Sequence, residues 1–436
     1  MDRRDFLAVG AASGFAGAIP VSAMQASPAT LLMINPGLDR SRAQHILRQA
    51  GFDAVLVGRS ENVFYATGNR PLMSRLGIAD SSFAIIPADS SAPVIYVLPQ
   101  FSYYYSVVDA GLAQGVELHL VTGPDAGGNA PAFYYTSPDK ALIPARERQR
   151  RERTDAVSPY FATTAAAVAS ILGKLGANGG RIGYDSLEAQ QLLKIAAPSA
   201  QGANAVDTVK AMRLIKSAFE IQLMRAASAA NVAAARKTAE NLRNLGTIRN
   251  VRNYFNGEVS RLGNSPGFMV VHGVVDEAYD ETFTQGTSVL IDCVSTLHGY
   301  HGDYGRTIFI GEPRQPMAAK VRAMGVAWDE LRQQLKPGMR FSEIRAAGAN
   351  ILRKLGYNIN VPFNPHCVGL AHTEQPMADN AGVAIDTLLA PGMIISVDCP
   401  LMEASTAGTA HLEDLTLITT EGQAPIHDTG NNVIIV

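Results

Sequence analysis

Hydrophobic and polar positions change their pattern near residue 200, and this change divides the chain into two parts. In the first part, short continuous apolar runs alternate with segments of helical spacing. The segment 39–50 is predicted to be helical, because Asp39 stands at its start and Gly51 follows its end. Buried strands are predicted at 54–57, 83–87 and 94–98, and a further helix at 163–175. Strands and helices that alternate in this way are typical of an α/β domain, which we place at residues 36–200.

The second part opens with a long helical pattern at 217–245, rich in Ala, Leu, Met, Arg and Glu. Two further helices stop at residues that terminate helices, Pro337 with Gly338 and then Gly356. These helices are predicted at 318–335 and 341–355, and strands at 288–294, 307–310, 393–397 and 412–419. Because 436 residues are too many for one core, we place a second domain at 207–436 and expect an α+β fold overall.

The first residues resemble a twin-arginine export signal. Arg3 and Arg4 precede Phe6 and Leu7, and a small, apolar stretch rich in Gly and Ala follows. This stretch is too short to span a bilayer permanently. We therefore predict an export signal at residues 1–27, a periplasmic or otherwise exported location, and no stable membrane insertion.

The composition gives no support for nucleic acid as a partner and indicates how the cysteines are used. With 47% hydrophobic residues, 17% charged residues and a net charge of −2, the chain gives no electrostatic reason to bind nucleic acid. The one dense basic run, residues 146–153 (RERQRRER), is interleaved with glutamate and is predicted to be a solvated loop in an irregular segment at 123–154. The three cysteines, Cys293, Cys367 and Cys399, are too few for a disulfide scaffold, so we expect them to pack as small apolar side chains.

Carboxylates and imidazoles recur on the predicted strands of the second domain. Asp292 stands inside an apolar strand, where an unpaired charge is costly, and Asp303 follows at a spacing that suits two adjacent antiparallel strands. Arg306 is an alternative partner for them, in a structural ion pair. Further along the chain come His366, His372, Asp398, Glu413 and Asp414. Four carboxylates with one histidine form a mixed oxygen and nitrogen set that suits two divalent ions.

In this order along the chain, these residues resemble the pita-bread metallopeptidases and their relatives: aminopeptidase P, prolidase, methionine aminopeptidase and creatinase. The matching motifs are LID at 290–292, Y-x-x-D-x-x-R-T at 300–307, H-x-x-G-L at 366–370, PGM at 391–393 and ED at 413–414. The segment 53–68 (DAVLVGRSENVFYATG) is similar to the creatinase-type N-terminal domain, and 213–220 (RLIKSAFE) to the entry into the catalytic domain. The resemblance implies a creatinase-like N-terminal α/β domain followed by a pita-bread catalytic domain.

The resemblance also implies a metal centre with assigned ligands. Asp292 would bind one metal, Asp303 and Glu413 would bridge both, and His366 with Asp398 would complete the coordination of the other. Two divalent ions are implied, manganese first, with cobalt, iron or zinc as alternatives. Such ions lower the pKa of a water molecule between them, so that it attacks an amide carbonyl at neutral pH.

Further roles follow from the same resemblance. His372, Asp398 and Glu413 are implied in the catalytic steps, and His272, His372 and His411 in binding the substrate. The implied substrate is a short peptide or another amide, and the implied activity that of an Xaa-Pro aminopeptidase or a dipeptidase-like enzyme. Relatives are commonly homodimers or homotetramers, which is the assembly expected here.

Two positions depart from the family's pattern and leave alternatives open. Asp398 stands where the family usually has Glu, and His411 stands where proline-specific members carry Arg, so the requirement for proline stays open. The alternatives are creatinase-like C–N hydrolysis or a metal-dependent lyase reaction on the same fold, and a non-catalytic binding module. Asp414 and three histidines, His298, His301 and His427, are expected at strand ends, on the surface or behind the ligands.

Overall fold

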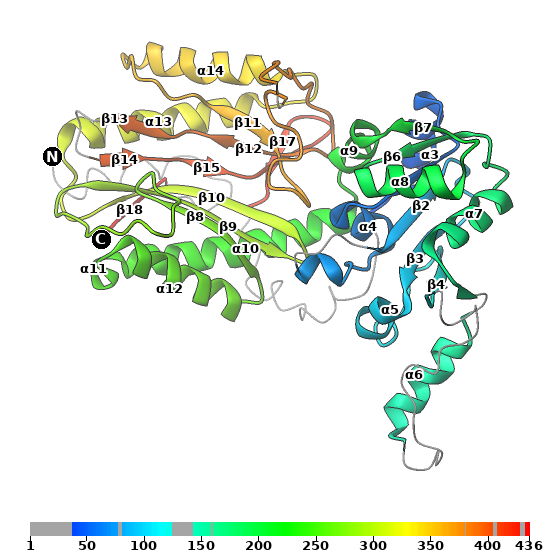
Figure 1. Ribbon diagram of the computed structural model, residues 1–436. Coiled ribbons are helices and arrows are strands. Elements are labelled where there is room, and N and C mark those ends of the chain that lie inside the picture. The colour runs from blue at the N-terminus through cyan, green and yellow to red at the C-terminus, as the bar shows by residue number, and fades with distance from the viewer. Residues whose placement is uncertain are drawn as a thin grey trace. The chain divides into compact units, whose positions relative to one another are not determined.

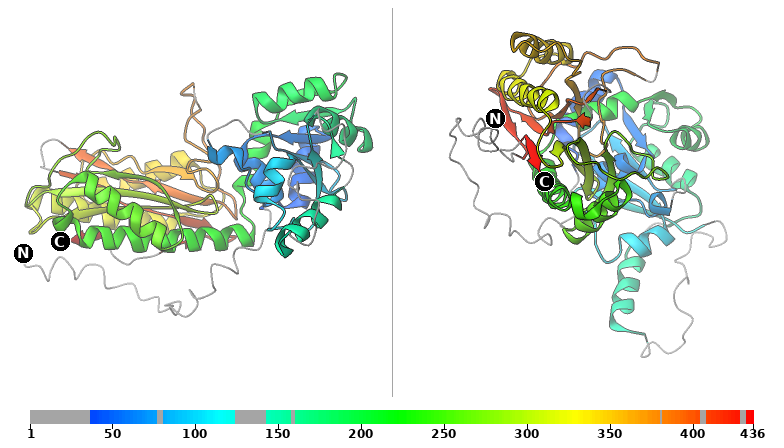
Figure 2. Two further views of the ribbon diagram at one scale, coloured as in Figure 1. Left: turned by 60° about the horizontal axis from the view of Figure 1, so that its bottom comes forward. Right: turned by 90° about the vertical axis from the view of Figure 1, so that its left-hand side faces the viewer.

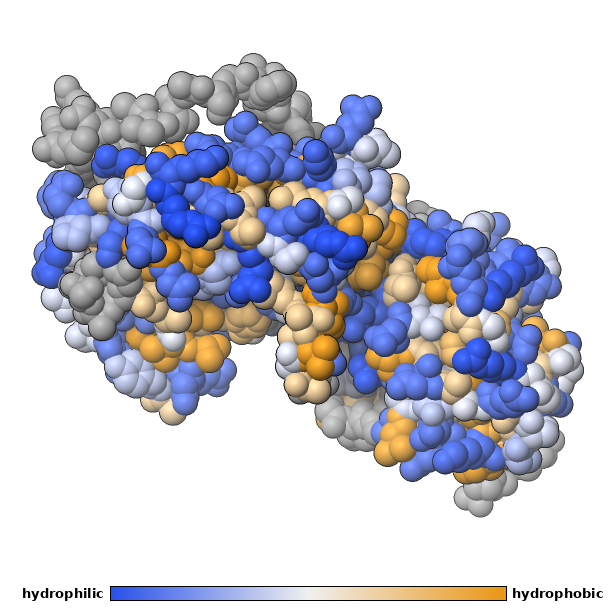
Figure 3. Space-filling model, turned by 90° about the horizontal axis from the view of Figure 1, so that it is seen from above, coloured by the Kyte–Doolittle hydropathy of each residue, from blue (hydrophilic) through white to orange (hydrophobic). Residues whose placement is uncertain are grey.

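The computed structural model describes residues 37–76, 81–123, 143–157, 160–379, 381–403, 408–427 and 432–436. Within these ranges the chain forms two compact units, which divide between Arg213 and Leu214. The predicted export signal at 1–27 lies outside the described ranges. In those ranges, none of the helices combines the length and the apolar character that crossing a membrane requires. The face of the C-terminal unit seen in Figure 3 mixes hydrophilic residues with smaller groups of apolar ones.

The N-terminal unit is built on one mixed sheet of seven strands in the order β5-β4-β3-β2-β1-β6-β7 (Figure 1). β1 pairs with β2, and β2 with β3, in antiparallel fashion, while the other neighbours are parallel. Its strands are β1 (Ala54–Val57), β2 (Phe83–Pro87), β3 (Val94–Pro99), β4 (Val116–Val121), β5 (Tyr160–Phe161), β6 (Arg181–Tyr184) and β7 (Gln201–Asn204). Its helices are α3 (Arg40–Ala50), α4 (Ser60–Thr67), η3 (Met73–Leu76), α5 (Gln100–Ser106), α6 (Ala145–Asp155), α7 (Thr164–Lys174), α8 (Leu187–Ala196) and α9 (Val206–Leu214). The predicted α/β character is therefore confirmed.

The local signals used to predict this unit act as expected. Asp39 accepts a hydrogen bond from the backbone of Arg42 at the start of α3, and Gly51 ends the helix with a left-handed φ of 70°. The predicted strands at 54–57, 83–87 and 94–98 correspond to β1, β2 and β3, and almost every residue in them is buried. Capping residues and continuous apolar runs were thus sufficient to predict these elements from the sequence.

The basic run at 146–153 is helical, so the prediction of a solvated loop was wrong. It forms most of α6, in which Arg150 lies over the ring of Tyr104 at 4.0 Å. Arg150 also pairs with Asp109 at 3.0 Å and with Glu147 at 3.3 Å. Arg and Glu are good helix formers, and pairs three or four positions apart stabilise a helix without an apolar stripe. Residues 124–142 of the segment predicted to be irregular lie outside the described ranges.

The C-terminal unit contains two sheets between two groups of helices. α13 (Gln315–Gln334) and α14 (Phe341–Lys354) lie on one side of the strands, and α10 (Ala218–Glu240), α11 (Leu242–Leu245) and α12 (Ile248–Arg261) lie on the other (Figures 1 and 2). Apolar side chains of α13 and α14 pack with β11 and β12 in one core, and those of α10 and α12 pack with β8 and β9 in another. Trp328 of α13 lies in the first core and is 1% exposed.

The larger sheet of this unit has the strand order β13-β14-β9-β10-β15, with β8 also paired to β9 and β18 to β10. The smaller sheet has the order β11-β12-β16-β17. The strands of the larger sheet are β8 (Ser265–Val271), β9 (Ser288–Leu297), β10 (Tyr300–Phe309), β13 (Leu401–Glu403), β14 (Gly408–Ala410), β15 (Glu413–Asp414) and β18 (Val433–Ile435). Those of the smaller sheet are β11 (Asn364–Cys367), β12 (Ile394–Asp398), β16 (Thr416–Ile418) and β17 (Gln423–Pro425).

Several boundaries differ from the predicted ones for identifiable reasons. The helix predicted at 217–245 ends as α10 at Glu240, and α11 forms the remaining turn. The strands predicted at 288–294 and 307–310 extend toward each other, because His298 and Gly299 take φ values of 50° and 85° and close a two-residue hairpin turn. The segment 412–419 is two short strands in different sheets rather than one.

The helix α10 begins with a complete capping box at Ser217. The Ser217 hydroxyl accepts a hydrogen bond from the backbone of Glu220, and the Glu220 carboxylate accepts one from the backbone of Ser217 at 2.7 Å. The other Glu220 oxygen accepts a hydrogen bond from the Tyr300 hydroxyl at 3.1 Å. Tyr300 is the first residue of β10, so this contact ties the start of the helix to the strand that carries Asp303.

Candidate metal centre

The hairpin of β9 and β10 positions the first two carboxylates. Asp292 lies opposite Gly305 across the two strands, and Asp303 lies opposite Val294. Residues opposite each other in an antiparallel pair, and residues two apart in one strand, point to the same face of the sheet. Asp292 and Asp303 therefore share one face, as the spacing predicted.

Three short strands bring the remaining predicted ligands to the same place. On the smaller sheet, Asn364 pairs with Asp398 and His366 pairs with Ser396, so His366 and Asp398 lie on one face. Glu413 opens β15 and lies opposite Gly305 of β10, on the side away from Asp292. The two sheets thus deliver five side chains, from segments distant in sequence, to one cluster.

Distances within the cluster show how closely these side chains meet. The Nε2 atom of His366 lies 3.5 Å from Glu413 Oε1, 3.6 Å from Asp398 Oδ2 and 3.8 Å from Asp303 Oδ2. His372 joins them, with its Nε2 atom 3.1 Å from Asp303 Oδ2. The Ser396 hydroxyl donates a hydrogen bond to Glu413 and orients that carboxylate. The structure therefore brings His372 to the predicted ligands.

The donor atoms of this cluster fit divalent cations. Asp292 Oδ1, Asp303 Oδ1 and both ring nitrogens of His366 are buried and make no hydrogen bond to any described residue. Buried polar atoms without partners cost free energy unless a ligand satisfies them. Three groups have ligand atoms within 4.8 Å of one another: Asp303, His366 and His372; Asp292, His411 and Glu413; and His366, Asp398 and Glu413. Carboxylate and imidazole donors in such groups suit Mn²⁺, Fe²⁺, Co²⁺ or Zn²⁺.

The pKa values of these groups indicate a site that lacks positive charge. Burial, together with the charges of Glu413 and Asp303, raises the pKa of Asp292 well above its ordinary value. Burial and then the charge of Glu413 raise the pKa of Asp398 to about 6. Burial acts to lower the pKa of His411, but its hydrogen bond to Glu413 and the surrounding carboxylates outweigh this and raise the pKa to about 9. Bound cations would supply the missing positive charge and reverse these directions.

Glu413 differs from the other carboxylates of the cluster. Burial and the charge of Asp303 act to raise its pKa, but the polar contacts with His366, His411 and Asp398 outweigh them and lower the pKa to about 2. Glu413 is therefore ionised throughout the neutral range, as a carboxylate that binds two cations must be.

Two of the histidines predicted to bind substrate, His272 and His411, do not lie at the rim of the cluster. The contacts of His272 are with Thr409 Oγ1 at 3.1 Å and Glu281 at 3.9 Å. His411 is 3% exposed, and its Nε2 atom lies 3.1 Å from Glu413 Oε2. The substrate role of both residues stays a prediction.

Arg306 does not pair with either hairpin carboxylate, so that alternative was wrong. Its guanidinium contacts Asp414 Oδ1 at 2.7 Å, and Trp328 Nε1 donates a hydrogen bond to the other oxygen of Asp414 at 3.1 Å. Strand parity could have revealed this, because Arg306 is three residues from Asp303 and so points to the opposite face. His427, also buried, lies 3.5 Å from Asp414, behind the cluster.

A buried ion pair that no sequence signal indicated supports the loop that carries His372. Lys216 Nζ lies 3.0 Å from Glu374 Oε2, and their side chains are 0% and 2% exposed. The other oxygen of Glu374 accepts a hydrogen bond from the backbone of Leu370 at 2.8 Å. Gly369 is required here, because a Cβ atom would lie 2.5 Å from Glu374 and 2.8 Å from Lys216. The pair therefore fixes the turn from β11 toward His372.

The three cysteines behind the cluster are buried and free, as predicted. Burial raises the pKa of the Cys367 thiol to about 12, and the pKa values of Cys293 and Cys399 are raised well above the ordinary value. Thiols with such pKa values stay protonated and act as small apolar side chains.

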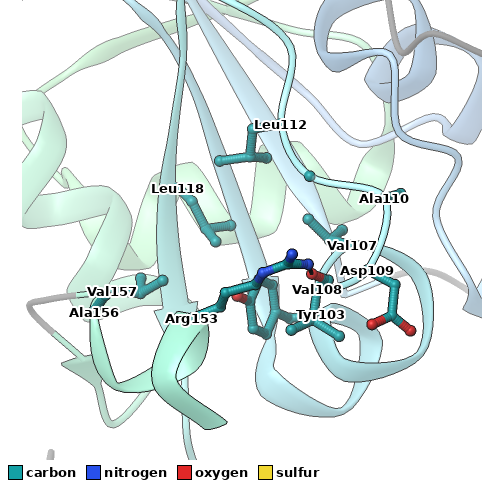
Figure 4. Close-up of a pocket in the computed structure, with 11 residues that line it drawn as sticks. Tyr103, Val107, Val108, Asp109, Ala110, Leu112, Leu118, Arg153, Ala156 and Val157 are labelled. Atoms are coloured by element: carbon teal, nitrogen blue, oxygen red, sulfur yellow. Dashed lines mark hydrogen bonds between the residues drawn. The ribbon is translucent and has the colours of Figure 1, made fainter. Parts of the chain in front are cut away.

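A separate cavity of about 520 Å³ lies within the N-terminal unit (Figure 4). It is lined by residues between 103 and 157, among them Tyr103, Leu118 and Arg153, and by no member of the acidic cluster. Arg153 donates a hydrogen bond to the carbonyl of Val108 at 2.9 Å and Asp109 pairs with Arg146, so the charged groups there have protein partners. All of the residues that line this cavity belong to the N-terminal unit.

The fold and the cluster define a metallopeptidase with a pita-bread catalytic unit. Residues 222–420, which lie within the C-terminal unit, match Metallopeptidase family M24. The protein is therefore a metal-dependent peptide hydrolase.

Individual relatives and solved structures agree with this assignment. The chain is 27% identical over 264 residues to a probable dipeptidase PepE of Mycobacterium tuberculosis, covering 58% of this chain and 69% of that protein. It is 29% identical over 166 residues to an Xaa-Pro dipeptidase of Pyrococcus horikoshii, covering 37% of this chain and 45% of that protein. The fold is similar to the prolidase from Pyrococcus horikoshii, with a TM-score of 0.62, 20% identity and coverage of 89% and 98%. It is also similar to the X-Pro aminopeptidase from Thermotoga maritima, with a TM-score of 0.64, 17% identity and coverage of 90% and 100%.

Proposed function

We propose that the protein is an exported, dinuclear peptidase that cleaves short peptides at Xaa-Pro bonds. The observation that supports the metal centre is the cluster of four carboxylates and His366, in which Asp292 Oδ1, Asp303 Oδ1 and both ring nitrogens of His366 lack hydrogen-bond partners among the described residues. The observation that supports the substrate is the set of relatives, which includes an Xaa-Pro dipeptidase and solved prolidases.

The residues would divide between two cations. Asp292 would hold one and His366 with Asp398 the other, while Asp303 and Glu413 would bridge the two. When bound, two divalent cations activate a water molecule and polarise the scissile carbonyl. Manganese remains the first expectation for their identity, because hard carboxylate oxygens dominate the set.

Two side chains of the cluster are accessible to a substrate. The side chain of His372 is 29% exposed, and its Nε2 atom contacts the buried Asp303, so the imidazole stands at the edge of the cluster and can donate to a substrate oxygen. The side chain of Asp398 is 32% exposed, so its carboxylate can reach a substrate, accept a proton and return it to a leaving nitrogen. Asp398 is thus the stronger candidate for proton transfer than Glu413, which is ionised and buried.

A peptide panel tests the substrate. Purified protein loaded with Mn²⁺ is expected to hydrolyse Xaa-Pro dipeptides and short Xaa-Pro peptides at least about tenfold faster, in kcat/KM, than matched Xaa-Ala peptides, since a tenfold ratio needs only about 1.4 kcal/mol of differential binding. Product formation is followed by liquid chromatography. Equal rates on both series would overturn the proline requirement, and cleavage of neither series by protein with two bound metals would overturn peptide specificity.

Export is proposed on the residues of the amino-terminal segment. The change Arg3→Lys together with Arg4→Lys is expected to leave the uncleaved precursor inside the cell, because the twin-arginine pathway reads the guanidinium pair as an address. Cell fractionation and the mass of the protein report the outcome. The matched control is Arg48→Lys in α3, and export of the double variant at the wild-type level would contradict the proposal.

A further inference from the structure

The imidazole of His411 lies closer to the proposed metal centre than its predicted role in substrate binding requires. The His411 ring stands directly over Gly305, because a Cβ atom on Gly305 would collide with Cδ2 and Nε2 of that ring. Gly305 is the residue of β10 that lies opposite both Asp292 on β9 and Glu413 on β15. The ring therefore fills the space above the sheet between these two carboxylates.

The contacts of His411 agree with this placement. Its Nε2 atom lies 3.1 Å from Glu413 Oε2, and Asp292, His411 and Glu413 each offer a ligand atom within 4.8 Å of the others. The Nδ1 atom of His411 is buried without a hydrogen-bond partner among the described residues, and so is Asp292 Oδ1. Asp292 Oδ1 is therefore a buried oxygen of this group that no described residue satisfies, and the Nε2 atom of His411 is the ring nitrogen that faces Glu413.

The backbone holds His411 in position from the far side. The hydroxyl of Thr307 accepts a hydrogen bond from the His411 backbone nitrogen at 3.0 Å and donates one to its carbonyl oxygen at 3.0 Å. Thr307 follows Gly305 by two positions on β10. The same strand therefore supplies both the hydroxyl that holds the His411 backbone and the glycine that leaves room for its ring. A ligand held by its own backbone in this way is preorganised, which favours tight metal binding.

We propose that His411 is a metal ligand, through Nε2, of the cation held by Asp292 and Glu413. The inference rests on the proposed metal centre, and it deepens that function by assigning one imidazole to each cation position, His411 to one and His366 to the other. Nε2 and Glu413 Oε2 lie 3.1 Å apart, a separation close to that of two atoms bound to one cation at about 2.1 Å. An imidazole in place of a third oxygen shifts the preference of this position toward Zn²⁺, Co²⁺ or Fe²⁺ and away from Mg²⁺.

Metal binding, rather than activity, tests the assignment. Full-length His411→Ala and His411→Gln are titrated with Zn²⁺ in competition with a chelating dye. We expect two binding steps in the wild-type protein, of which one is weakened at least about tenfold in both variants while the other is unchanged. Zinc X-ray absorption is expected to show one imidazole per zinc ion in the wild type and one imidazole per two zinc ions in a fully loaded variant. Thermal unfolding of the metal-free proteins checks that the variants fold.

The controls separate failure of this inference from failure of the metal centre. His45→Ala removes an exposed histidine of α3 in the N-terminal unit and is expected to leave both binding steps unchanged. Two unchanged steps and an unchanged imidazole count in folded His411 variants would overturn the inference and leave His411 as a structural partner of Glu413. No binding of Zn²⁺, Co²⁺ or Mn²⁺ by the wild-type protein would overturn the metal centre itself.

Discussion

Replacement of Asp303 by alanine is expected to remove bound metal and hydrolytic activity together. Asp303 is 0% exposed and touches His366 and His372, so its carboxylate lies where both proposed cations need a ligand. Loss of groups that only orient a ligand already costs about 10- to 100-fold in affinity or activity, and loss of a bridging ligand should cost more than about 100-fold. Metal content after dialysis and peptide hydrolysis report both effects.

The same variant separates catalysis from folding. Without metal, Asp303 is a buried carboxylate beside other carboxylates, which is unfavourable in the folded state. The metal-free Asp303→Ala protein should therefore unfold at a temperature equal to or above that of the metal-free wild type. Glu277→Ala, which removes an exposed carboxylate, is the matched control and should keep both metal and activity. Full activity in Asp303→Ala would rule out a centre bridged by this residue.

The largest effect on stability is expected at the buried pair of Lys216 and Glu374. Lys216→Met leaves the Glu374 carboxylate buried without its ammonium partner, and breaking such a pair typically costs about 3–5 kcal/mol. Urea unfolding of the metal-free protein measures the change. Lys237→Met removes a surface pair with Glu258, in which the lysine side chain is 45% exposed, and should change stability far less than Lys216→Met does.

The pH dependence of the Lys216→Met effect has a definite sign. When the ammonium of Lys216 is lost, burial favours the neutral form of the Glu374 carboxyl, so the folded variant holds a proton that the unfolded chain releases. Stability of the variant relative to wild type should therefore be better preserved below pH 4, and the deficit should grow as the pH rises toward neutrality. The double change Lys216→Met with Glu374→Gln should recover part of the loss at pH 7. A deficit independent of pH, with no recovery, would assign the effect to packing alone.

Features of the fold that depend on neighbours in sequence could be predicted. The helix α3 and the strands β1 to β3 followed from capping residues and continuous apolar runs. The helix α6 could not be predicted in this way, because it has no apolar stripe and Arg150 finds its partners Asp109 and Tyr104 in another segment. From the sequence alone, its charged residues are equally compatible with a loop and with a helix, because the positions of those partners are not known.

In the candidate site too, some residues could be predicted from the sequence and others depend on partners that are distant in the chain. Asp292, Asp303, His366, Asp398 and Glu413 could be singled out because a charge inside an apolar strand is costly and because their order resembles a known family. Lys216 and Glu374 stand 158 positions apart, and Arg306 and Asp414 stand 108 positions apart, so no local pattern relates them. The position of His411 above Gly305 depends on the pairing of β10 with β15, which the spacing of the residues did not reveal.

Trp328, the only tryptophan in the sequence, gives the protein a built-in optical probe. Its indole N–H donates to Asp414, the residue next to Glu413 on β15, while the ring itself lies in the core between α13 and the smaller sheet. A change in charge at Glu413 therefore alters the electric field at the Trp328 indole, which is hydrogen-bonded to the neighbouring residue and is shielded from water. Its ultraviolet emission should change in wavelength or intensity as cations bind, so occupancy of the centre can be followed in the unlabelled protein.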